Sequence, residues 1–300
     1  MEKTKNQIRT PVEDRVLYTI NLILISAFCL VILLPMWYIV VSSFSSGAAI
    51  LQNRVFLWPV DFTLNGYKTV FSHKYILSGY RNTIVYTVLG TLINVVMTLA
   101  CAYPLSRRDF PFRRFFMIMM TLTMYFGGGL IPSYLVNINL GLIDNLWVMI
   151  IPGAMAVYYV ILVRTFMIST IPRELFEAAS IDGCSDAYYF FAIMLPLLKP
   201  VIAVISLYYA VGHWNSYFTA MIYLNTKSKF PLQLILREIL VSSQVKLEDI
   251  HDAELLKSLI GLEALLKYSL IIVATVPILL TYPFAQKYFV KGVMVGSLKG

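Results

Sequence analysis

Six apolar segments, each long enough to cross a bilayer as a helix, constrain the fold of this chain more than any other feature. A transmembrane helix needs about 20 predominantly apolar residues. Because 59% of the 300 residues are hydrophobic and only 13% are charged, a soluble domain could not cover so much apolar surface. The sequence therefore predicts an all-α polytopic membrane protein with six transmembrane helices. We expect them at residues 16–41, 82–104, 115–136, 146–166, 200–224 and 265–288.

The distribution of lysine and arginine predicts the orientation of these spans. The N-terminal tail 1–15 and the short loop 107–114 are rich in basic residues, whereas the loop 137–145 has none. Short loops carry the most weight in the positive-inside rule. We therefore expect the N-terminal tail, the loop 170–196 and the C-terminal tail 289–300 in the cytoplasm, with 16–288 as the membrane domain. The net charge of +8 is explained by these clusters beside the spans and does not indicate nucleic-acid binding.

Two loops on the outer side, 45–81 and 225–264, are too long to be simple connectors. The first carries aromatic residues of the kind found at the level of lipid headgroups. Within the second, the segment 232–240 predicts a helix lying along the surface. Either these loops cover the ends of the spans, or they form a docking platform for an external binding protein.

Several classes of function are disfavoured by what the sequence lacks. No predicted span contains Asp or Glu, whereas ion-coupled carriers and proton pumps usually place a carboxylate at membrane depth. The chain has neither an H-E-x-x-H pair nor a G-x-x-x-x-G-K-[ST] loop, and its three cysteines show no metal-ligand spacing. We expect no metal or cofactor on this chain. If transport is driven by ATP, the nucleotide must bind to another polypeptide, so the chain itself is not an enzyme.

Glycine and proline residues predict irregularities inside the spans. The run of three glycines at 127–129 either breaks the third span or lets a neighbouring backbone approach closely. Pro132, Pro152 and Pro277 are expected inside helices, where a membrane protein tolerates proline and the helix is kinked.

The fifth span is the one with polar and aromatic side chains. Aromatic faces stack on sugar rings, and Asn or His can form hydrogen bonds with hydroxyl groups, so these residues predict a patch that lines the substrate pathway. The alternative is that they join helices or form an interfacial belt. The candidate pathway residues are Tyr209, His213, Trp214, Asn215 and Tyr217.

The loop 170–196 predicts two short helices outside the bilayer. Pro172 suits the first turn of a helix over 173–181, and Gly183 supplies a left-handed residue that ends it. Ser185 is a plausible N-cap for a second helix that runs toward residue 196. Three side chains of the first helix share an apolar face, which we expect to bind a partner protein: Leu175, Phe176 and Ala179.

The spacing within this loop resembles that of a known family. Glu177-Ala178-Ala179, three residues, Gly183, nine residues and then Ile193-x-Leu195-Pro196 is similar to the EAA loop of ABC importer permeases. Further stretches resemble the carbohydrate branch of that family, among them the segments 128–132, 213–215 and 282–292. Within this branch, the chain looks like the second permease subunit of oligo- or polysaccharide importers from Gram-positive bacteria.

The resemblance implies a type I ABC importer permease fold in the plasma membrane, surrounded by lipid. It implies as partners a second homologous permease, a cytoplasmic ABC ATPase dimer that holds ATP and Mg, and an extracellular solute-binding lipoprotein. The substrate would be an oligo- or polysaccharide.

The resemblance also implies roles for individual loop residues. Glu177 would contact a basic residue of the ATPase, while Leu175, Phe176 and Ala179 would fill its cleft. Ala178, like Ala179, would allow close approach, and Asp182 and Gly183 would make the turn between the two helices.

Two alternatives remain open on the sequence alone. The chain could belong to an ABC importer for another solute, such as an amino acid or a polyamine. It could also be a standalone channel or membrane scaffold without an ATPase, which would leave the apolar face of the loop helix unexplained.

Overall fold

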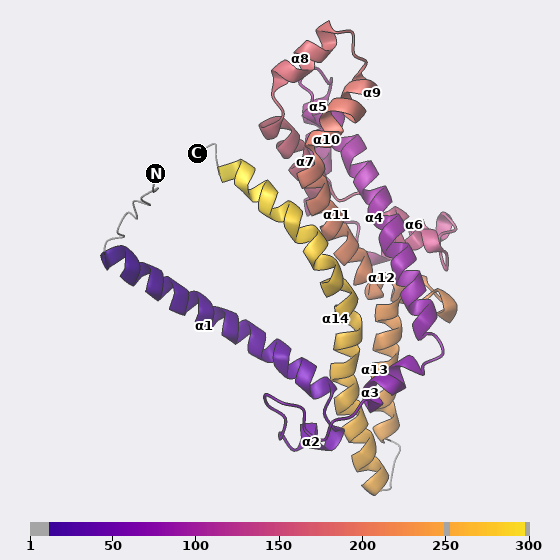
Figure 1. The fold of residues 1–300 in the computed structure, drawn as a ribbon. Helices are drawn as coiled ribbons and strands as arrows, with labels where there is room; N and C mark the ends of the chain where they lie inside the picture. The colour runs from indigo at the N-terminus through magenta and orange to yellow at the C-terminus, as the bar shows by residue number, and fades with distance from the viewer. Residues whose placement is uncertain (1–11, 249–252, 298–300) are drawn as a thin grey trace. The chain divides into compact units, whose positions relative to one another are not determined.

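The computed structural model describes residues 12–248 and 253–297, and it contains helices but no strands in these ranges. Contacts divide the chain into two compact units, residues 1–70 with 242–272 and residues 71–241 with 273–300 (Figure 1). The all-α class expected from the sequence is confirmed.

The first unit contains α1 (Val12–Ser43), α2 (Gly47–Leu51), most of α3 (Asn65–Phe71) and the first part of α14 (Ala253–Ser297). A small apolar core joins the end of α1, α2 and α14, with Tyr38 of α1 edge-on to Tyr268 of α14 at 5.7 Å between ring centroids. The backbones of α2 and α14 meet at Gly47, where a Cβ atom would collide with the backbone of Gly261. Glycine at position 47 is therefore required by a close approach of two helices.

Apart from its last two turns, the apolar stretch of α1 lies open in the structure. Residues 14–37 are exposed, and no residue in the apolar window of this helix is buried. An apolar helix without protein contacts is the form expected for a span that faces lipid or another subunit.

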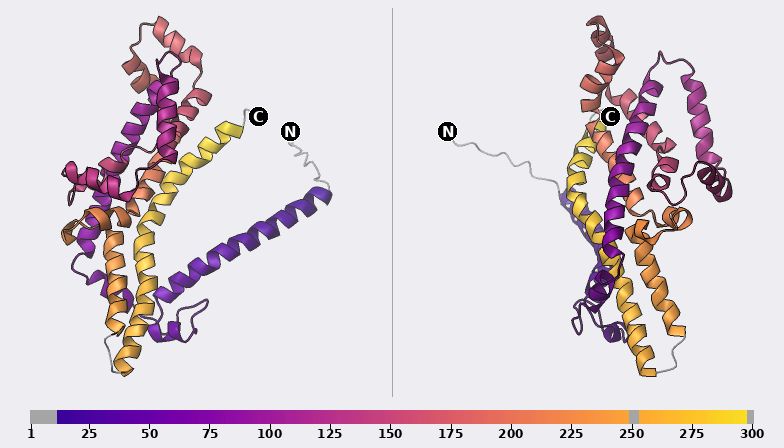
Figure 2. Two further views of the ribbon diagram at one scale, coloured as in Figure 1. Left: turned by 180° about the vertical axis from the view of Figure 1, so that it is seen from behind. Right: turned by 90° about the vertical axis from the view of Figure 1, so that its right-hand side faces the viewer.

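The second unit is built around three helices, α4 (Ile76–Ser106), α7 (Val157–Thr170) and α11 (Lys199–Trp214). They lie side by side in all three views, and α4 packs against both of the others (Figure 2). Their shared core contains Leu99 and Ala102 of α4, Val160 and Val163 of α7, and Ile205 of α11.

Shorter helices complete the second unit. They are α5 (Arg113–Tyr125), α6 (Leu130–Asn139), η1 (Leu146–Met149), η2 (Ile151–Gly153), α8 (Arg173–Ile181), α9 (Asp186–Tyr188), the π-helix η3 (Tyr189–Met194), α10 (Leu195–Leu197), α12 (Tyr217–Tyr223), η4 (Lys227–Lys229) and α13 (Leu232–Glu248), whose end belongs to the first unit.

Three helices in the described ranges are long and apolar enough to cross a membrane, and up to six spans result if each bent pair of helices counts as one. The expected spans at 16–41, 82–104 and 265–288 lie within α1, α4 and α14. The other three expected spans are each interrupted by a break between two helices.

The interruptions have local causes. The glycine run at 127–129 separates α5 from α6, which meet at 115°, and Gly129 adopts φ +83° in open space, where a Cβ atom would contact no other atom. These glycines therefore break the helix and do not serve a close backbone approach. The prediction of helix-interior prolines holds for Pro277 but is wrong for two others, because Pro132 lies in the first turn of α6 and Pro152 lies in η2.

The helix expected at 232–240 is present as the first half of α13, but it does not lie on the surface. Leu232, Leu234, Ile235 and Ile239 are buried. Gly79 of α4 packs so closely on this helix that a Cβ atom would collide with Ile235.

Candidate functional site

The loop 170–196 forms the helices that its sequence predicts. Pro172 has extended backbone angles and directly precedes α8, which runs over Arg173–Ile181 as expected. Gly183 has φ +76°, and its N–H donates to the carbonyl of Ser180. The Ser185 hydroxyl accepts from the N–H of Tyr188 at 3.3 Å and caps the second helical segment. Both caps are local signals, which is why the sequence alone could place them.

The apolar face of α8 packs against the chain itself. Ala179 is buried, Leu175 and Phe176 are half-buried, and all three join the core formed by α4, α7 and α11. The Phe176 ring meets Tyr189 of the π-helix edge-on at 5.0 Å. Ala179 is covered by the chain itself, whereas contact of the half-buried Leu175 and Phe176 with a cleft of another subunit stays a prediction.

The opposite face of α8 is the one that remains open. Glu174, Glu177, Ala178 and Ile181 recur at helical spacing and are all exposed, and the Ile181 side chain is 87% exposed. We call these four residues the outer face of α8. A large aliphatic side chain at this exposure, between polar neighbours, was not singled out by the sequence analysis.

Glu177 is not free on this face. Its carboxylate is 2.7 Å from Arg173 Nε in an i,i+4 ion pair whose side chains are more than half exposed. Such exposed helical pairs are worth about 0.3–0.5 kcal/mol, so Glu177 can exchange this cation for another at little cost.

Arg107, in the loop between α4 and α5, packs on top of α8. Its guanidinium carbon lies 3.2 Å from the centroid of the Phe176 ring, and its side chain is only 13% exposed. Two of its nitrogens contact both carboxylate oxygens of Asp109, at 3.2 and 3.1 Å. These hydrogen bonds hold the pKa of Asp109 below its usual value. Arg164 of α7 adds a further link by donating to the carbonyl of Leu105 at 2.8 Å.

A pocket of about 450 Å³ lies at this junction. It is lined by the α4–α5 loop, the end of α7, α8 and the π-helix, and includes Arg107, Asp109, Phe176, Glu177 and Tyr189. The end of α4 and the loop helices thus form one packed assembly.

The polar residues of the fifth span are mostly used inside the chain. The Tyr209 hydroxyl contacts Thr98 at 2.8 Å and accepts from the N–H of Ala156 at 3.0 Å. The Trp214 indole donates to the carbonyl of Ala274 at 3.0 Å. Tyr209 and Trp214 are both buried, so the prediction that they line an open pathway is corrected to a role in joining helices.

His213 belongs to the same internal network. Its Nε2 is 2.6 Å from Asn94 Oδ1, and the Asn94 amide donates to the carbonyl of Gly153. Gly153 and Ala156 flank the break between η2 and α7, where backbone groups lose their helical partners. Asn94 and Tyr209 satisfy these groups, as a broken span requires. Asn215 and Tyr217 are exposed, and a role in the pathway stays a prediction for these two.

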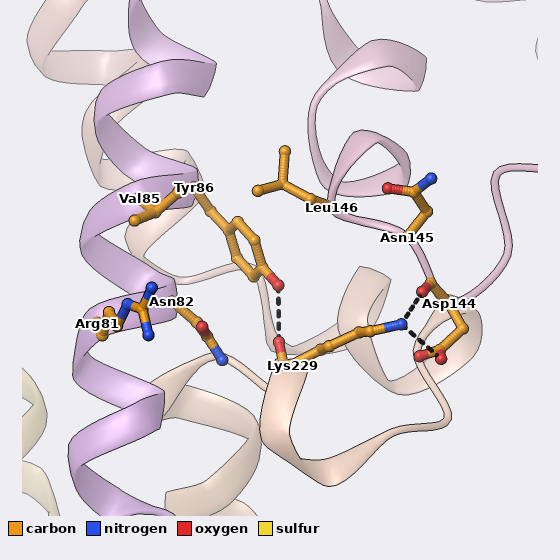
Figure 3. Close-up of a pocket in the computed structure, with 8 residues that line it drawn as sticks. All are labelled: Arg81, Asn82, Val85, Tyr86, Asp144, Asn145, Leu146 and Lys229. Carbon is orange, nitrogen blue, oxygen red and sulfur yellow. Dashed lines mark hydrogen bonds and ion pairs between the residues drawn. The ribbon is translucent and has the colours of Figure 1, made fainter.

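A second pocket, of about 500 Å³, lies at the other end of α4 (Figure 3). Four of its residues come from α4, namely Arg81, Asn82, Val85 and Tyr86. Asp144, Asn145 and Leu146 come from the segment after α6, and Lys229 is the last residue of η4.

Hydrogen bonds fix the walls of this pocket. The Tyr86 hydroxyl donates to the carbonyl of Lys229 at 2.7 Å, and Lys229 Nζ reaches Asp144 Oδ2 at 2.8 Å (Figure 3). Asp144 also accepts from the N–H groups of Asn225 and Thr226 and from the Thr226 hydroxyl. The ammonium of Lys229, followed by these hydrogen bonds, holds the pKa of Asp144 well below its usual range.

The two pockets lie at opposite ends of α4. Arg81 lines one, and Arg107 follows the last turn beside the other. The helical residues between Arg81 and Leu105 cover about 36 Å at 1.5 Å per residue, which exceeds the roughly 30 Å of a hydrocarbon core. Among the described residues there is no cluster of His, Cys, Asp or Glu that could hold a metal ion.

The chain is similar to proteins of known families along nearly its whole length. Residues 76–295 match the model of the family described as "binding-protein-dependent transport system inner membrane component". "Protein LplC" of Bacillus subtilis is 39% identical over 286 residues, which cover 95% of this chain and 96% of the relative. The "polygalacturonan/rhamnogalacturonan transport system permease protein YtcP" of the same organism is 40% identical over 273 residues, or 91% and 94%.

A solved structure is also similar. It is a chain of a bacterial ABC transporter involved in the import of the acidic polysaccharide alginate, with a TM-score of 0.80 and 34% identity, covering 94% of this chain and 100% of that one. This likeness confirms the ABC importer permease fold expected from the EAA loop. With the family model matching more than two thirds of the chain, the protein belongs to the family of inner-membrane components of binding-protein-dependent transport systems.

Proposed function

We propose that this chain is one permease subunit of an ATP-driven importer for an oligo- or polysaccharide, and that it is driven through the outer face of α8. The ATPase would be a separate cytoplasmic dimer, the second half of the pathway a homologous permease, and the saccharide would arrive on an extracellular binding lipoprotein. The C-terminal end of α4, which lies beside α8, would then face the cytoplasm, as the basic loop 107–114 predicts.

One observation carries the proposal. The inner face of α8, formed by Leu175, Phe176 and Ala179, joins the apolar cluster that also contains residues of α4, α7 and α11, while its outer face leaves Ile181 almost fully exposed. A helix fixed on one side to the membrane core and open on the other is suited to transmit a push from a partner. Motion of an ATPase docked on Ile181 would move the three core helices together.

Relatives support a saccharide over an amino acid or a polyamine. The names of two similar proteins state transport of polygalacturonan or rhamnogalacturonan and of the acidic polysaccharide alginate. A standalone channel or scaffold, which the sequence alone left open, gains no support from these relatives.

The experiment is copurification of the ATPase with this chain from its native membrane in mild detergent. In Ile181→Asp, a carboxylate would have to be buried at the interface, so we expect ATPase recovery to fall by about tenfold or more. Phe56→Asp is the matched control, because it adds the same charge at another exposed apolar position, in the loop 45–81. The control should retain the ATPase.

Two results would contradict the proposal. If wild-type chain brings down no ATPase under conditions that recover a second permease, an ATP-driven role fails. If Ile181→Asp recovers the ATPase as well as wild type does, the outer face of α8 is not the docking surface.

A further inference from the structure

The pocket in Figure 3 presents more hydrogen-bond donors than acceptors to a ligand. Its one carboxylate, on Asp144, already accepts from Lys229, Thr226 and two backbone N–H groups. The amide nitrogen of Asn82 is likewise used, because it donates to the carbonyls of Ser228 and Phe230. These groups build the walls and are not available to a ligand.

Most of the groups that remain available are donors, although Asn82 Oδ1, an acceptor, has no partner in the described part of the chain. Arg81 is exposed and has no ion pair among the described residues. Asn145 accepts through Oδ1 from the N–H of Trp147, while its amide nitrogen has no partner in the described part of the chain. Lys229 Nζ contacts only Asp144 and keeps a third proton. With two cations and one anion among its lining residues, the pocket carries a formal charge of +1.

An excess of donors and positive charge selects an anionic group rich in oxygen. A carboxylate fits best, because arginine binds it through two parallel N–H···O bonds. The lining also offers an apolar surface from Val85, Tyr86 and Leu146, on which the C–H face of a sugar ring can lie. The volume of about 500 Å³ lies within the range of small-molecule sites.

The geometry points to a saccharide-binding subsite in this pocket that takes a uronate sugar, with Arg81 as the residue that binds its carboxylate. This inference rests on the proposed function, since the pocket lies at the end of α4 opposite α8 and would receive substrate from outside the cell. It makes this subunit a contributor to selectivity for acidic saccharides.

The test compares uptake of labelled trigalacturonate with uptake of its methyl ester, in cells that express the chain with its native partners. The two probes differ in charge at the carboxyl groups. In Arg81→Gln we expect the uptake rate of the acid at saturating concentration to fall about tenfold, as loss of a charge-assisted hydrogen bond implies. Uptake of the ester should change less than about twofold, since it makes no ion pair. Arg81→Lys should restore part of the acid uptake.

The matched control is Arg237→Gln, which removes an exposed arginine of α13 that does not line the pocket. It should leave both uptake rates unchanged. The inference is overturned if Arg81→Gln leaves acid uptake unchanged, or if it lowers the uptake of acid and ester equally.

The inference and the proposed function fail in different ways. Wild-type cells that import neutral oligosaccharides but neither galacturonate probe would overturn the uronate subsite and leave the importer standing. Wild-type cells that import no saccharide would overturn both.

Discussion

Arg107 and Phe176 lie face to face, with the guanidinium carbon 3.2 Å above the centre of the ring, although the two residues belong to different loops. One loop joins α4 to α5, and the other contains α8. Because the guanidinium is largely withdrawn from water and is also held by Asp109, this contact ties α8 to the end of α4. Under the proposed function, a push on α8 would reach α4 through this contact.

Arg107→Lys should weaken this connection, because an ammonium neither stacks flat on a ring nor binds Asp109 through two nitrogens. We expect the number of ATP molecules hydrolysed per saccharide imported to rise several-fold in proteoliposomes, with the ATPase still bound. Arg108→Lys, at an exposed neighbouring position, serves as the control and should keep the wild-type ratio. An unchanged ratio in Arg107→Lys would remove this contact from the coupling mechanism.

Gly183 sets the turn after α8 and should tolerate few replacements. At φ +76° a residue with a Cβ costs about 1–2 kcal/mol, and proline would also lose the N–H that bonds to Ser180. We expect Gly183→Val to lower saccharide uptake several-fold and Gly183→Pro to abolish it, while both proteins insert into the membrane. Gly212→Ala, on an open face of α11, is the control and should preserve uptake. Normal uptake by Gly183→Pro would show that the turn is dispensable.

Asn94 holds the broken fourth span and should be important for stability. Asn94→Leu leaves the carbonyl of Gly153 and the ring of His213 without their partner, at a cost of about 1–3 kcal/mol. The measurement is the Tm of the purified protein in detergent, which should fall by several degrees. Thr91→Val is the control on the same helix, because the buried Thr91 hydroxyl has no hydrogen-bond partner among the described residues. Its Tm should stay the same or rise, and an equal fall in both variants would contradict this account.

Asp144 should make stability depend on pH in the acid range. Its pKa is depressed in the folded protein, so its stabilising contribution is complete above the unfolded pKa near 3.9 and is lost as pH falls through the folded pKa. Between pH 5 and 8, Asp144→Asn should lower the free energy of unfolding by about 1–3 kcal/mol and lower Tm accordingly. This loss of stability should shrink below about pH 4.

Asp61→Asn is the matched control for Asp144→Asn. Both aspartates have positive φ, which asparagine tolerates, but Asp61 has only an exposed ion pair with Arg54 at 3.8 Å. Asp61→Asn should change the free energy of unfolding by less than about 1 kcal/mol, so its effect on Tm should be small. A difference between wild type and Asp144→Asn that stayed constant from pH 5 to well below the unfolded pKa would show that the ion pair is not its source.

Local signals in the sequence predicted local structure well. The bounds of α8, the left-handed Gly183 and the Ser185 cap all depend on neighbouring residues, and all three are confirmed. The periodicity of Leu175 and Phe176 also predicted an apolar face correctly. It could not show what covers that face, because a covering residue such as Arg107 is distant in the sequence.

The same limit explains what was missed in the membrane domain. Tyr209 and Trp214 were expected to face the pathway, but their partners are backbone groups of Ala156 and Ala274, more than 50 residues away in the chain. The residues that line the pocket around Arg81 come from three separate segments, so no single stretch of the sequence predicts it. The glycine run at 127–129 predicted an interruption, but not the angle of 115° at which α5 and α6 meet.

The bond between Asn94 and His213 has a consequence for how the protein is made. The two residues are separated by 119 positions, so the ribosome completes α4 long before it reaches α11. During that interval the nascent α4 lies in the insertion machinery or the bilayer with a carboxamide that lacks its final partners, Gly153 and His213. Until the later spans are synthesised, this carboxamide therefore needs other hydrogen-bond partners, such as water, the insertase or neighbouring backbone.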